Sequence, residues 1–333
     1  MPAMKQVLVL GFGGPQRSAS TIFRVAQYEP LFLEHGAVLN FIAKPDVGWR
    51  SLAALRGADV VINQKCIFGA GMLAGVRTLA KRLVFDIDDA MWARPVRPIH
   101  PIKRWQAELR LSRWVRASDL VTVANSYIGA HFRRPGLNVE VVPMSLDLDL
   151  WRPGVKTQEP ESEVLMGWAG SPVSFPYLEA IAPALGEALR RNPGLKLAVY
   201  SGKRPSLSIP FEYVEFKRGS EHEFIQRLDI GLLPLPDDES ARGKSPMKAI
   251  QYLACGVPVV GVAPGATKDI LTAENSLLVA SDQDWVDALG RLACNVGLRR
   301  QLGMAARADA LANFDKDQVG ERFVRLVLGL PHS

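Results

Sequence analysis

The chain has 333 residues, a mass of 36.5 kDa, a formal net charge of +6 and a pI near 9.3. At roughly 100–200 residues per domain, this length predicts two domains. The 28 glycines and 23 prolines make up about 15% of the chain, well below the share that marks disordered sequences. Three cysteines without a close pair argue against a disulfide framework and a zinc ribbon, and the positive charge favours anionic partners.

The N-terminus carries a short apolar run, residues 7–10, that leads into a glycine-rich turn. This pattern predicts a buried strand rather than a signal peptide. No apolar run approaches the roughly 20 residues that cross a bilayer. We therefore expect a cytoplasmic protein.

Short apolar runs alternate with amphipathic stretches along the first 150 residues. This alternation is typical of a parallel sheet that helices cover on both faces. The expected strands are residues 7–10, 38–42, 60–62, 83–85, 120–123 and 139–142, and the expected helices include residues 22–33, 72–79 and 105–115.

Residues 147–160 are rich in proline and polar residues and read as a linker between domains. The alternation then starts again, which predicts a second α/β domain. Its expected strands are residues 164–168, 195–200, 213–216, 230–233, 257–262 and 277–279. Its expected helices are residues 177–190, 247–255, 285–293 and 298–312, and a final helix covers 317–328.

The most informative stretch runs from Arg242 to residue 260. Ser245 is a favourable N-cap, Pro246 suits the first helical position and Gly256 suits the end of the helix. The sequence therefore predicts a short helix that begins near Met247 and leads into a buried strand.

Arg242, Lys244 and Lys248 gather at the start of this helix, where its dipole disfavours cations by about 0.3–1 kcal/mol each. A bound anion would explain the arrangement, because free backbone N–H groups would meet it there. The alternative is that the acidic residues at 237–239 pair with these cations.

This stretch resembles the donor-site helix of the GT-B glycosyltransferases, in particular retaining family 4, the "group 1" transferases. The resemblance is to the subset that reads R-G-K-x-x-x-K-x-x-Q-Y-x-A-x-G-x-P-V-V. Most members carry two glutamates, whose positions fall here on Gly243 and Gln251. The resemblance implies that Gln251 holds the ribose hydroxyls of a nucleotide, since an amide donates and accepts. Gly243 cannot replace the glutamate near the transferred sugar.

A second motif, F-D-I-D-D-A at residues 85–90, gathers Asp86, Asp88 and Asp89 after a strand. Carboxylates in this pattern suit a divalent metal, a sugar or acceptor site, or an N-cap cluster. The motif is similar to the F-D-x-D-D-A segment of the same subset, whose fold needs no metal for catalysis. The resemblance therefore favours an acceptor-side or sugar-contact role for Asp88 and Asp89.

Further loops match the family in position. Gly13 and Gly14 are similar to its first glycine loop, where backbone N–H groups approach a phosphate. A dinucleotide-binding turn would need a third glycine where Gln16 stands, so we do not expect NAD. The resemblance places Gly170 and Ser171 beside the diphosphate. Either Lys203 replaces the basic residues that relatives carry there, or it lies in a solvated turn.

Residues 94–116 form a basic region in which Glu108 is the lone acid. A basic helix with tryptophans either lies on anionic lipid or is a solvated helix whose tryptophans face the core. Both interpretations stay open for the cations and tryptophans Arg94, Arg97, Lys103, Arg104, Trp105, Arg110, Arg113, Trp114 and Arg116.

The resemblance implies a GT-B fold, in which two Rossmann-like domains face each other across a cleft. We expect an acceptor domain at 1–150, a nucleotide-sugar domain at 151–312 and a terminal helix, 313–333, that crosses back to the first domain.

The implied activity is that of a hexosyltransferase without metal or other cofactor. It would move a sugar from a nucleoside diphosphate, UDP in most relatives, to a glycan, a lipid-linked or a small-molecule acceptor, with retention, in surface-glycan or glycolipid synthesis. Arg242, Lys244, Lys248 and the N–H groups at Met247 would stabilise the leaving diphosphate. The alternatives are a sugar-nucleotide-binding protein without turnover, an inverting transferase and a sugar epimerase. We do not expect nucleic-acid binding, because no aromatic-basic module of known type is present.

Overall fold

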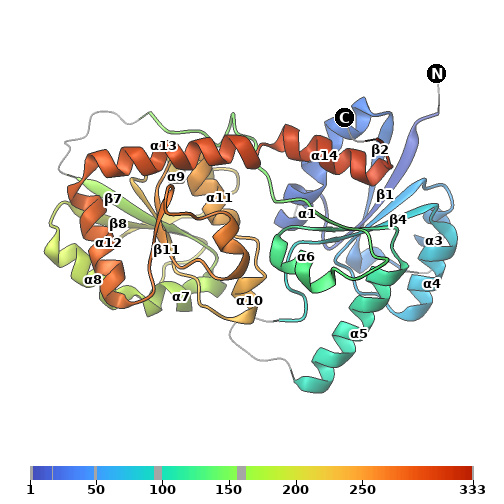
Figure 1. The fold of residues 1–333 in the computed structure, drawn as a ribbon, viewed down its shortest axis with the longest axis horizontal. Helices are drawn as coiled ribbons and strands as arrows, with labels where there is room; N and C mark the ends of the chain where they lie inside the picture. The colour runs from blue at the N-terminus through green and yellow to red at the C-terminus, as the bar shows by residue number, and fades with distance from the viewer. Residues whose placement is uncertain (1–2, 17, 49–50, 94–99, 156–162, 332–333) are drawn as a thin grey trace. The chain divides into compact units, whose positions relative to one another are not determined.

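The computed structural model describes residues 3–16, 18–48, 51–93, 100–155 and 163–331. Their contacts divide the chain into two compact units, each of which holds one sheet (Figure 1). Unit 1 comprises Met1–Ser145, Arg242–Ser245 and Lys316–Ser333, and unit 2 comprises Leu146–Ala241 and Pro246–Asp315. The expected linker, residues 147–160, lies partly outside the described residues.

The sheet of unit 1 has six parallel strands in the order β2-β1-β3-β4-β5-β6. Val7 of β1 pairs with Leu39 on one side and with Val60 on the other. The six expected strands are confirmed, because their continuous apolar runs are buried between helices. The bounds are β1 Lys5–Gly11, β2 Ala37–Ala43, β3 Val60–Gln64, β4 Arg82–Ile87, β5 Leu120–Val123 and β6 Val139–Val141.

Helices cover both faces of this sheet. The expected single helix over residues 22–33 is wrong: the chain forms two short helices joined by a 3-10 turn, and Pro30, which has no N–H, lies in the first turn of the second. The helical segments are α1 Ala19–Arg24, η1 Ala26–Tyr28, α2 Glu29–Glu34, η2 Lys44–Asp46, α3 Leu52–Leu55, α4 Ala70–Leu79, α5 Pro101–Ala117, α6 Ser126–Phe132 and α14 Lys316–Leu328.

The last helix, α14, belongs to unit 1 (Figure 1). The ring of Phe323 packs 5.5 Å from Tyr28 and 6.4 Å from Phe32, centroid to centroid. The guanidinium of Arg82 donates to the carbonyls of Leu326 and Val327, both at 3.0 Å. A cation at the C-terminus satisfies free carbonyls and favours the helix dipole.

The sheet of unit 2 also has six parallel strands, in the order β12-β11-β10-β7-β8-β9. All six expected strands are present, although several differ at their ends by one or two residues. The bounds are β7 Val164–Ala169, β8 Leu195–Ser201, β9 Glu212–Glu215, β10 Ile230–Leu233, β11 Val259–Gly261 and β12 Ser276–Leu278.

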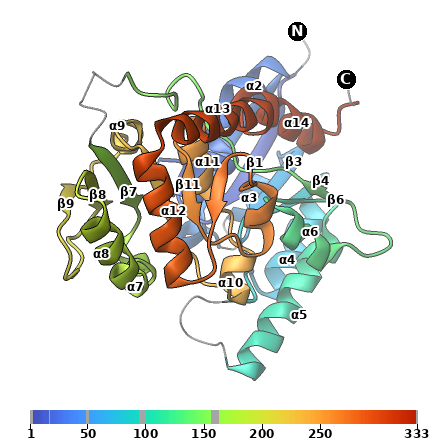
Figure 2. The ribbon, with the colours of Figure 1, turned by 60° about the vertical axis from the view of Figure 1, so that its left-hand side comes forward.

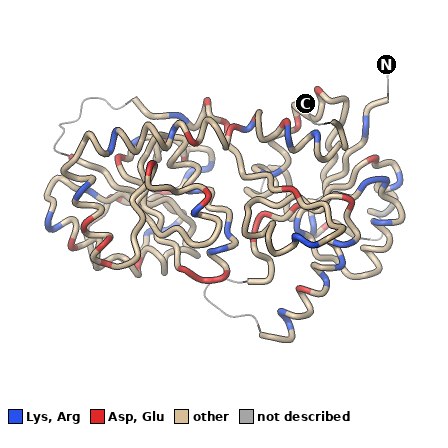
Figure 3. Tube along the Cα trace, viewed as in Figure 1, with Lys and Arg blue, Asp and Glu red and all other residues tan. Residues whose placement is uncertain are grey.

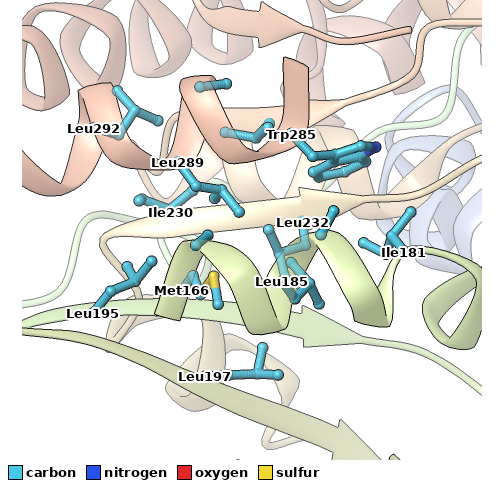
Figure 4. Close-up of a cluster of buried hydrophobic side chains, with 14 of the residues drawn as sticks. Met166, Ile181, Leu185, Leu195, Leu197, Ile230, Leu232, Trp285, Leu289 and Leu292 are labelled. Carbon is cyan, nitrogen blue, oxygen red and sulfur yellow. The ribbon is translucent and has the colours of Figure 1, made fainter. Parts of the chain in front are cut away.

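The helices of unit 2 pack on its sheet with α8 and α12 in contact on one face (Figure 2). Their apolar side chains enclose a core with Met166, Ile230 and Leu232 of the strands (Figure 4). The expected single helix at 177–190 is wrong, because it breaks at Ile181 before Pro183. The helical segments are η4 Pro172–Ser174, α7 Phe175–Ala180, α8 Ala182–Arg191, α9 Glu221–Gln226, α10 Glu239–Arg242, α11 Met247–Ala254, η5 Gly265–Asp269, α12 Asp282–Cys294 and α13 Val296–Asn313.

A buried ion pair ties helix α1 to the sheet of unit 1. Arg24 and Asp86 are almost fully buried, and their charged atoms lie 2.5 Å apart. The Thr122 hydroxyl donates to Asp86 at 2.7 Å, and Arg24 donates to the carbonyls of Val142 and Pro143. Although burial alone would lower the pKa of Arg24, the Asp86 carboxylate raises it, so the guanidinium of Arg24 stays charged.

We expect Arg24→Met to destabilise the protein by about 3–5 kcal/mol, because Asp86 would stay buried without its partner. Arg77→Met is the matched control: Arg77 pairs with Asp119 at 3.2 Å on the surface, where an ion pair contributes about 0–1 kcal/mol. Urea unfolding of both variants gives the comparison. Equal losses would show that burial of the Arg24–Asp86 pair does not matter.

Candidate functional site

The order of strands marks one place in unit 2 where a ligand is expected. Strands β8 and β9 follow on one side of β7, whereas β10 and the later strands lie on its other side. Ligands of open parallel sheets bind at such a switch point, beyond the carboxyl ends of the strands. Two segments follow the strands at this switch point. Gly170–Ser171 comes directly after β7, and helix α11 comes after β10 and the short helix α10.

Tyr252 holds α11 against this part of the sheet. Its hydroxyl accepts the N–H of Ala169 and also lies 3.3 Å from the carbonyl of Gly167, both on β7. The ring passes over Gly231 of β10, where a Cβ would come within 2.6 Å of it. Only glycine leaves room for the ring so close to the strand. Tyr252, the tyrosine of the Q-Y pair in the sequence motif, therefore faces the sheet.

Lys248 and Gln251 lie one turn apart on α11. Lys248 is partly buried and forms no ion pair with any described residue, and burial lowers its pKa to about 8 although Glu221 opposes this. Gln251 is 3% exposed, and its side-chain oxygen has no hydrogen-bond partner among the described residues. An unpartnered buried polar atom costs about 1–3 kcal/mol, so both groups point to a polar, anionic ligand.

Two buried hydroxyls near the same edge were not identified from the sequence. The Oγ of Ser201 at the end of β8 and the Oγ1 of Thr267 in η5 are buried, and the part of the chain described offers them no partner. Their only sequence signal is a hydroxyl residue shortly after an apolar run. Beyond Ser201, Lys203 is exposed, whereas the Arg204 guanidinium lies 4.6 Å from the Phe211 ring.

The segment Arg242–Ser245 belongs to unit 1, unlike Lys248. The expectation that Ser245 caps α11 is wrong: the N-cap is Pro246, and the Ser245 hydroxyl donates to the Asp88 carbonyl at 2.7 Å. At Gly243 a Cβ would collide with the Ala90 Cβ, so a glutamate could not stand there without a shift of Ala90.

Asp88 and Asp89 lie beyond the end of β4, beside a lysine that sequence analysis missed. The ammonium of Lys65 is 2.6 Å from Asp88 and 3.2 Å from Asp89, and the Ser20 hydroxyl donates to Asp88. Burial alone would lower the pKa of Lys65, but the two carboxylates raise it. Lys244 adds a further positive charge near Asp89.

Lys65 also has an unusual backbone. Its φ is +43°, a left-handed conformation that non-glycine residues rarely adopt, and its N–H donates to the Asp86 carbonyl at 2.8 Å. Such strain persists only where the surroundings impose it, and it concentrates at functional sites. The only signal in the sequence was a lysine directly after the apolar strand β3.

The three carboxylates do not gather around one point that suits a metal. The Asp86 carboxylate forms an ion pair with Arg24, and the Lys65 ammonium forms ion pairs with both Asp88 and Asp89. Among the described residues, no group of three acidic, histidine or cysteine side chains could hold a metal ion.

The glycine loop after β1 packs tightly on the start of α1. A Cβ at Gly13 would come within 2.8 Å of Ser18, and the Gly13 carbonyl accepts from the Thr21 hydroxyl at 3.2 Å. The Gly14 carbonyl accepts the N–H of Ser18. The loop lies at the carboxyl edge of the unit 1 sheet, and its expected contact with a phosphate stays a prediction.

A groove of about 2110 Å³ in unit 2 lies at the opposite end of its sheet, where the parallel strands begin. Val164, Leu195 and Pro258 line it at or just before the beginnings of their strands. Since ligands of parallel sheets bind at the carboxyl ends, we do not assign the nucleotide to this groove.

Comparison with known proteins identifies the fold. Residues 183–325 match the family model described as glycosyl transferase-like. No curated protein sequence matches the chain.

Solved structures match over nearly the whole chain. Sucrose-phosphate synthase from Thermosynechococcus elongatus is 14% identical, with a TM-score of 0.75 and coverage of 97% of this chain and 98% of that one. Anabaena HepE in complex with UDP is 13% identical, with a TM-score of 0.71 and coverage of 98% and 100%. An alpha-glucosyltransferase in complex with UDP and DNA is 11% identical, with a TM-score of 0.61 and coverage of 98% and 99%. The chain thus has the GT-B fold of these glycosyltransferase structures.

Proposed function

We propose that this chain is a glycosyltransferase that binds a nucleoside-diphosphate sugar on unit 2. The observation that carries the proposal is the pair Lys248 and Gln251 on the helix that follows the switch point of the sheet. Among the described residues, the cation has no ion pair and the buried amide oxygen has no hydrogen-bond partner. The ammonium would meet the diphosphate, and the amide oxygen would accept from ribose hydroxyls. The match of residues 183–325 to a glycosyl transferase-like model supports this site.

UDP is the proposed nucleotide, because solved structures of the same fold were determined with UDP or UDP-glucose. We place the chain in the retaining family 4 subset on its R-G-K and F-D-x-D-D-A motifs. Ser171, Lys203 and the glycines Gly13, Gly14 and Gly170 stay proposed contacts of the diphosphate.

The proposed reaction breaks the bond between the sugar carbon and the phosphate oxygen. Lys248, Lys244, Arg242 and the N–H groups at Met247 would stabilise the negative charge that develops on the leaving diphosphate. The acceptor hydroxyl would attack from the side that the diphosphate leaves, which retains the anomeric configuration. Its proton would pass to the departing phosphate oxygen, so no protein nucleophile is required.

On unit 1, Asp88 and Asp89 are the proposed contacts of the acceptor or the sugar hydroxyls. Lys65 keeps both carboxylates paired with a cation that the protein itself supplies, and this supports a reaction without a metal ion. The acceptor would be the hydroxyl of a glycan, a lipid-linked sugar or a small molecule, and the pathway would be surface-glycan or glycolipid synthesis.

We expect Lys248→Ala to lower kcat/KM by about 2–4 kcal/mol, or roughly 30- to 1000-fold, as for the loss of one preorganised donor. Because the pKa of Lys248 is about 8, the free protein loses this positive charge above that pH. UDP affinity, measured by calorimetry, should therefore fall by up to about tenfold between pH 7 and pH 9.

Lys248→Arg should flatten that pH profile, because a guanidinium stays charged throughout. Lys196→Ala, an exposed lysine of β8, is the control and should leave both readouts unchanged. Near-wild-type turnover of Lys248→Ala would contradict the diphosphate assignment.

Gln251→Leu separates a ligand site from a packing defect. The substitution removes a buried unpartnered oxygen, so thermal stability should stay equal or rise, while UDP affinity should drop by about tenfold through the loss of a ribose contact. Calorimetry with UDP and thermal unfolding without it give both values. Unchanged affinity together with raised stability would mean that this oxygen contacts no nucleotide.

Transfer should proceed in EDTA and yield a product with the same anomeric configuration as the donor. Proton NMR of that product reads the configuration directly. Activity lost in EDTA and restored by Mg²⁺ or Mn²⁺ would refute the metal-free reaction, and an inverted product would point to an inverting relative. Nucleotide-sugar binding without transfer to any acceptor would support a binding protein instead.

A further inference from the structure

The N-terminal half of helix α5 exposes a stripe of large apolar side chains. Ile102, Trp105 and Leu109 are 60%, 63% and 39% exposed. Spacings of three and four residues place them on one face of the helix. Sequence analysis left open whether both tryptophans of this region face the core, and the structure separates them: Trp114 is 1% exposed, whereas Trp105 faces solvent.

The other half of α5 fixes the direction in which this stripe points. Leu111, Trp114 and Val115 are buried against the sheet of unit 1. The Trp114 indole N–H donates to the Phe68 carbonyl at 3.1 Å, and its ring stacks 6.0 Å from Phe85. Helix α5 cannot rotate about its axis without breaking these contacts, so the stripe stays on the side of the helix opposite the sheet. The first half of α5 projects beyond the rest of unit 1 (Figures 1 and 2).

Basic residues recur along α5, between and after the residues of the stripe (Figure 3). Arg113 and Arg116 follow Leu109 by four and seven residues, on the same face, and both are exposed. The lone acid of the helix, Glu108, is paired with Arg104 at 3.0 Å. No ion pair with a described residue neutralises Lys103, Arg110, Arg113 or Arg116. The expected basic residues Arg94 and Arg97 lie outside the described residues.

The geometry points to α5 as a docking surface for an anionic lipid bilayer. The apolar side chains would enter the headgroup boundary while the cations beside them meet acidic headgroups, an arrangement that this combination of tryptophan, aliphatic and basic residues suits. An acidic protein would also attract the cations, but binding of such a protein would not account for the three apolar side chains at the projecting end. No described helix is long and apolar enough to cross a membrane, so contact through α5 would be peripheral.

Flotation of the full chain with vesicles tests this surface without nucleotide or acceptor, so its result is independent of the proposed activity. The wild type should float with phosphatidylcholine vesicles that contain about 30% phosphatidylglycerol, and not with phosphatidylcholine alone. Arg110→Gln with Arg113→Gln should lower the partition coefficient roughly 25-fold, about fivefold for each cation. High salt should weaken binding in the same direction.

The decisive variant replaces the stripe by Ile102→Ser, Trp105→Ser and Leu109→Ser, and it should lose binding by at least about tenfold. Its matched control is Met304→Ser with Leu311→Ser, two exposed apolar residues on α13, which should bind as the wild type does. Thermal unfolding checks that both variants are folded. Equal binding by the stripe variant and the wild type, or no binding of the wild type to anionic vesicles, would overturn the proposal.

Discussion

The buried pair Arg24–Asp86 fixes the carboxyl edge of the sheet in unit 1. It joins helix α1 to strand β4, and through Thr122 and the Val142 carbonyl it reaches β5 and the segment after β6. Asp86 stands two residues before Asp88, and its carbonyl accepts the N–H of Lys65. The same residue therefore holds both the strand and the strained turn that brings Lys65 to Asp88 and Asp89.

In unit 2, a tyrosine rather than an ion pair holds a helix of the candidate site against the sheet. Tyr252 bonds to the backbone of β7 and lies over Gly231, so helix α11 is held where its Lys248 and Gln251 meet the edge of the sheet. Among the described residues, the buried Gln251 oxygen has no hydrogen-bond partner and Lys248 has no ion pair. Folding alone does not explain these features, and this is why the two residues carry the functional proposal.

Strands were predictable because a buried parallel strand reads as a continuous apolar run, which needs no knowledge of its neighbours. Breaks within helices were not recognised: residues 22–33 and 177–190 have helical spacing throughout, but Pro30 and Pro183 each start a new helix. Ser245 shows a different limit. Its position suits an N-cap, yet its hydroxyl bonds to Asp88, 157 residues away, and a local pattern cannot show such a partner. Lys65 was not identified from the sequence for the same reason, because its partners Asp88 and Asp89 are also distant in the chain.

The placement of α14 in unit 1 has a consequence for synthesis of the protein. Val319, Phe323, Val324 and Val327 cover the face of the first sheet that carries Val7 and Val9. Domains usually fold as they emerge from the ribosome, at about 5–20 residues per second. Val25, Tyr28 and Phe32 cover part of that face early, but the rest stays uncovered until α14 has been translated, after the whole of unit 2. We therefore expect the nascent chain to need protection by chaperones for much of its elongation.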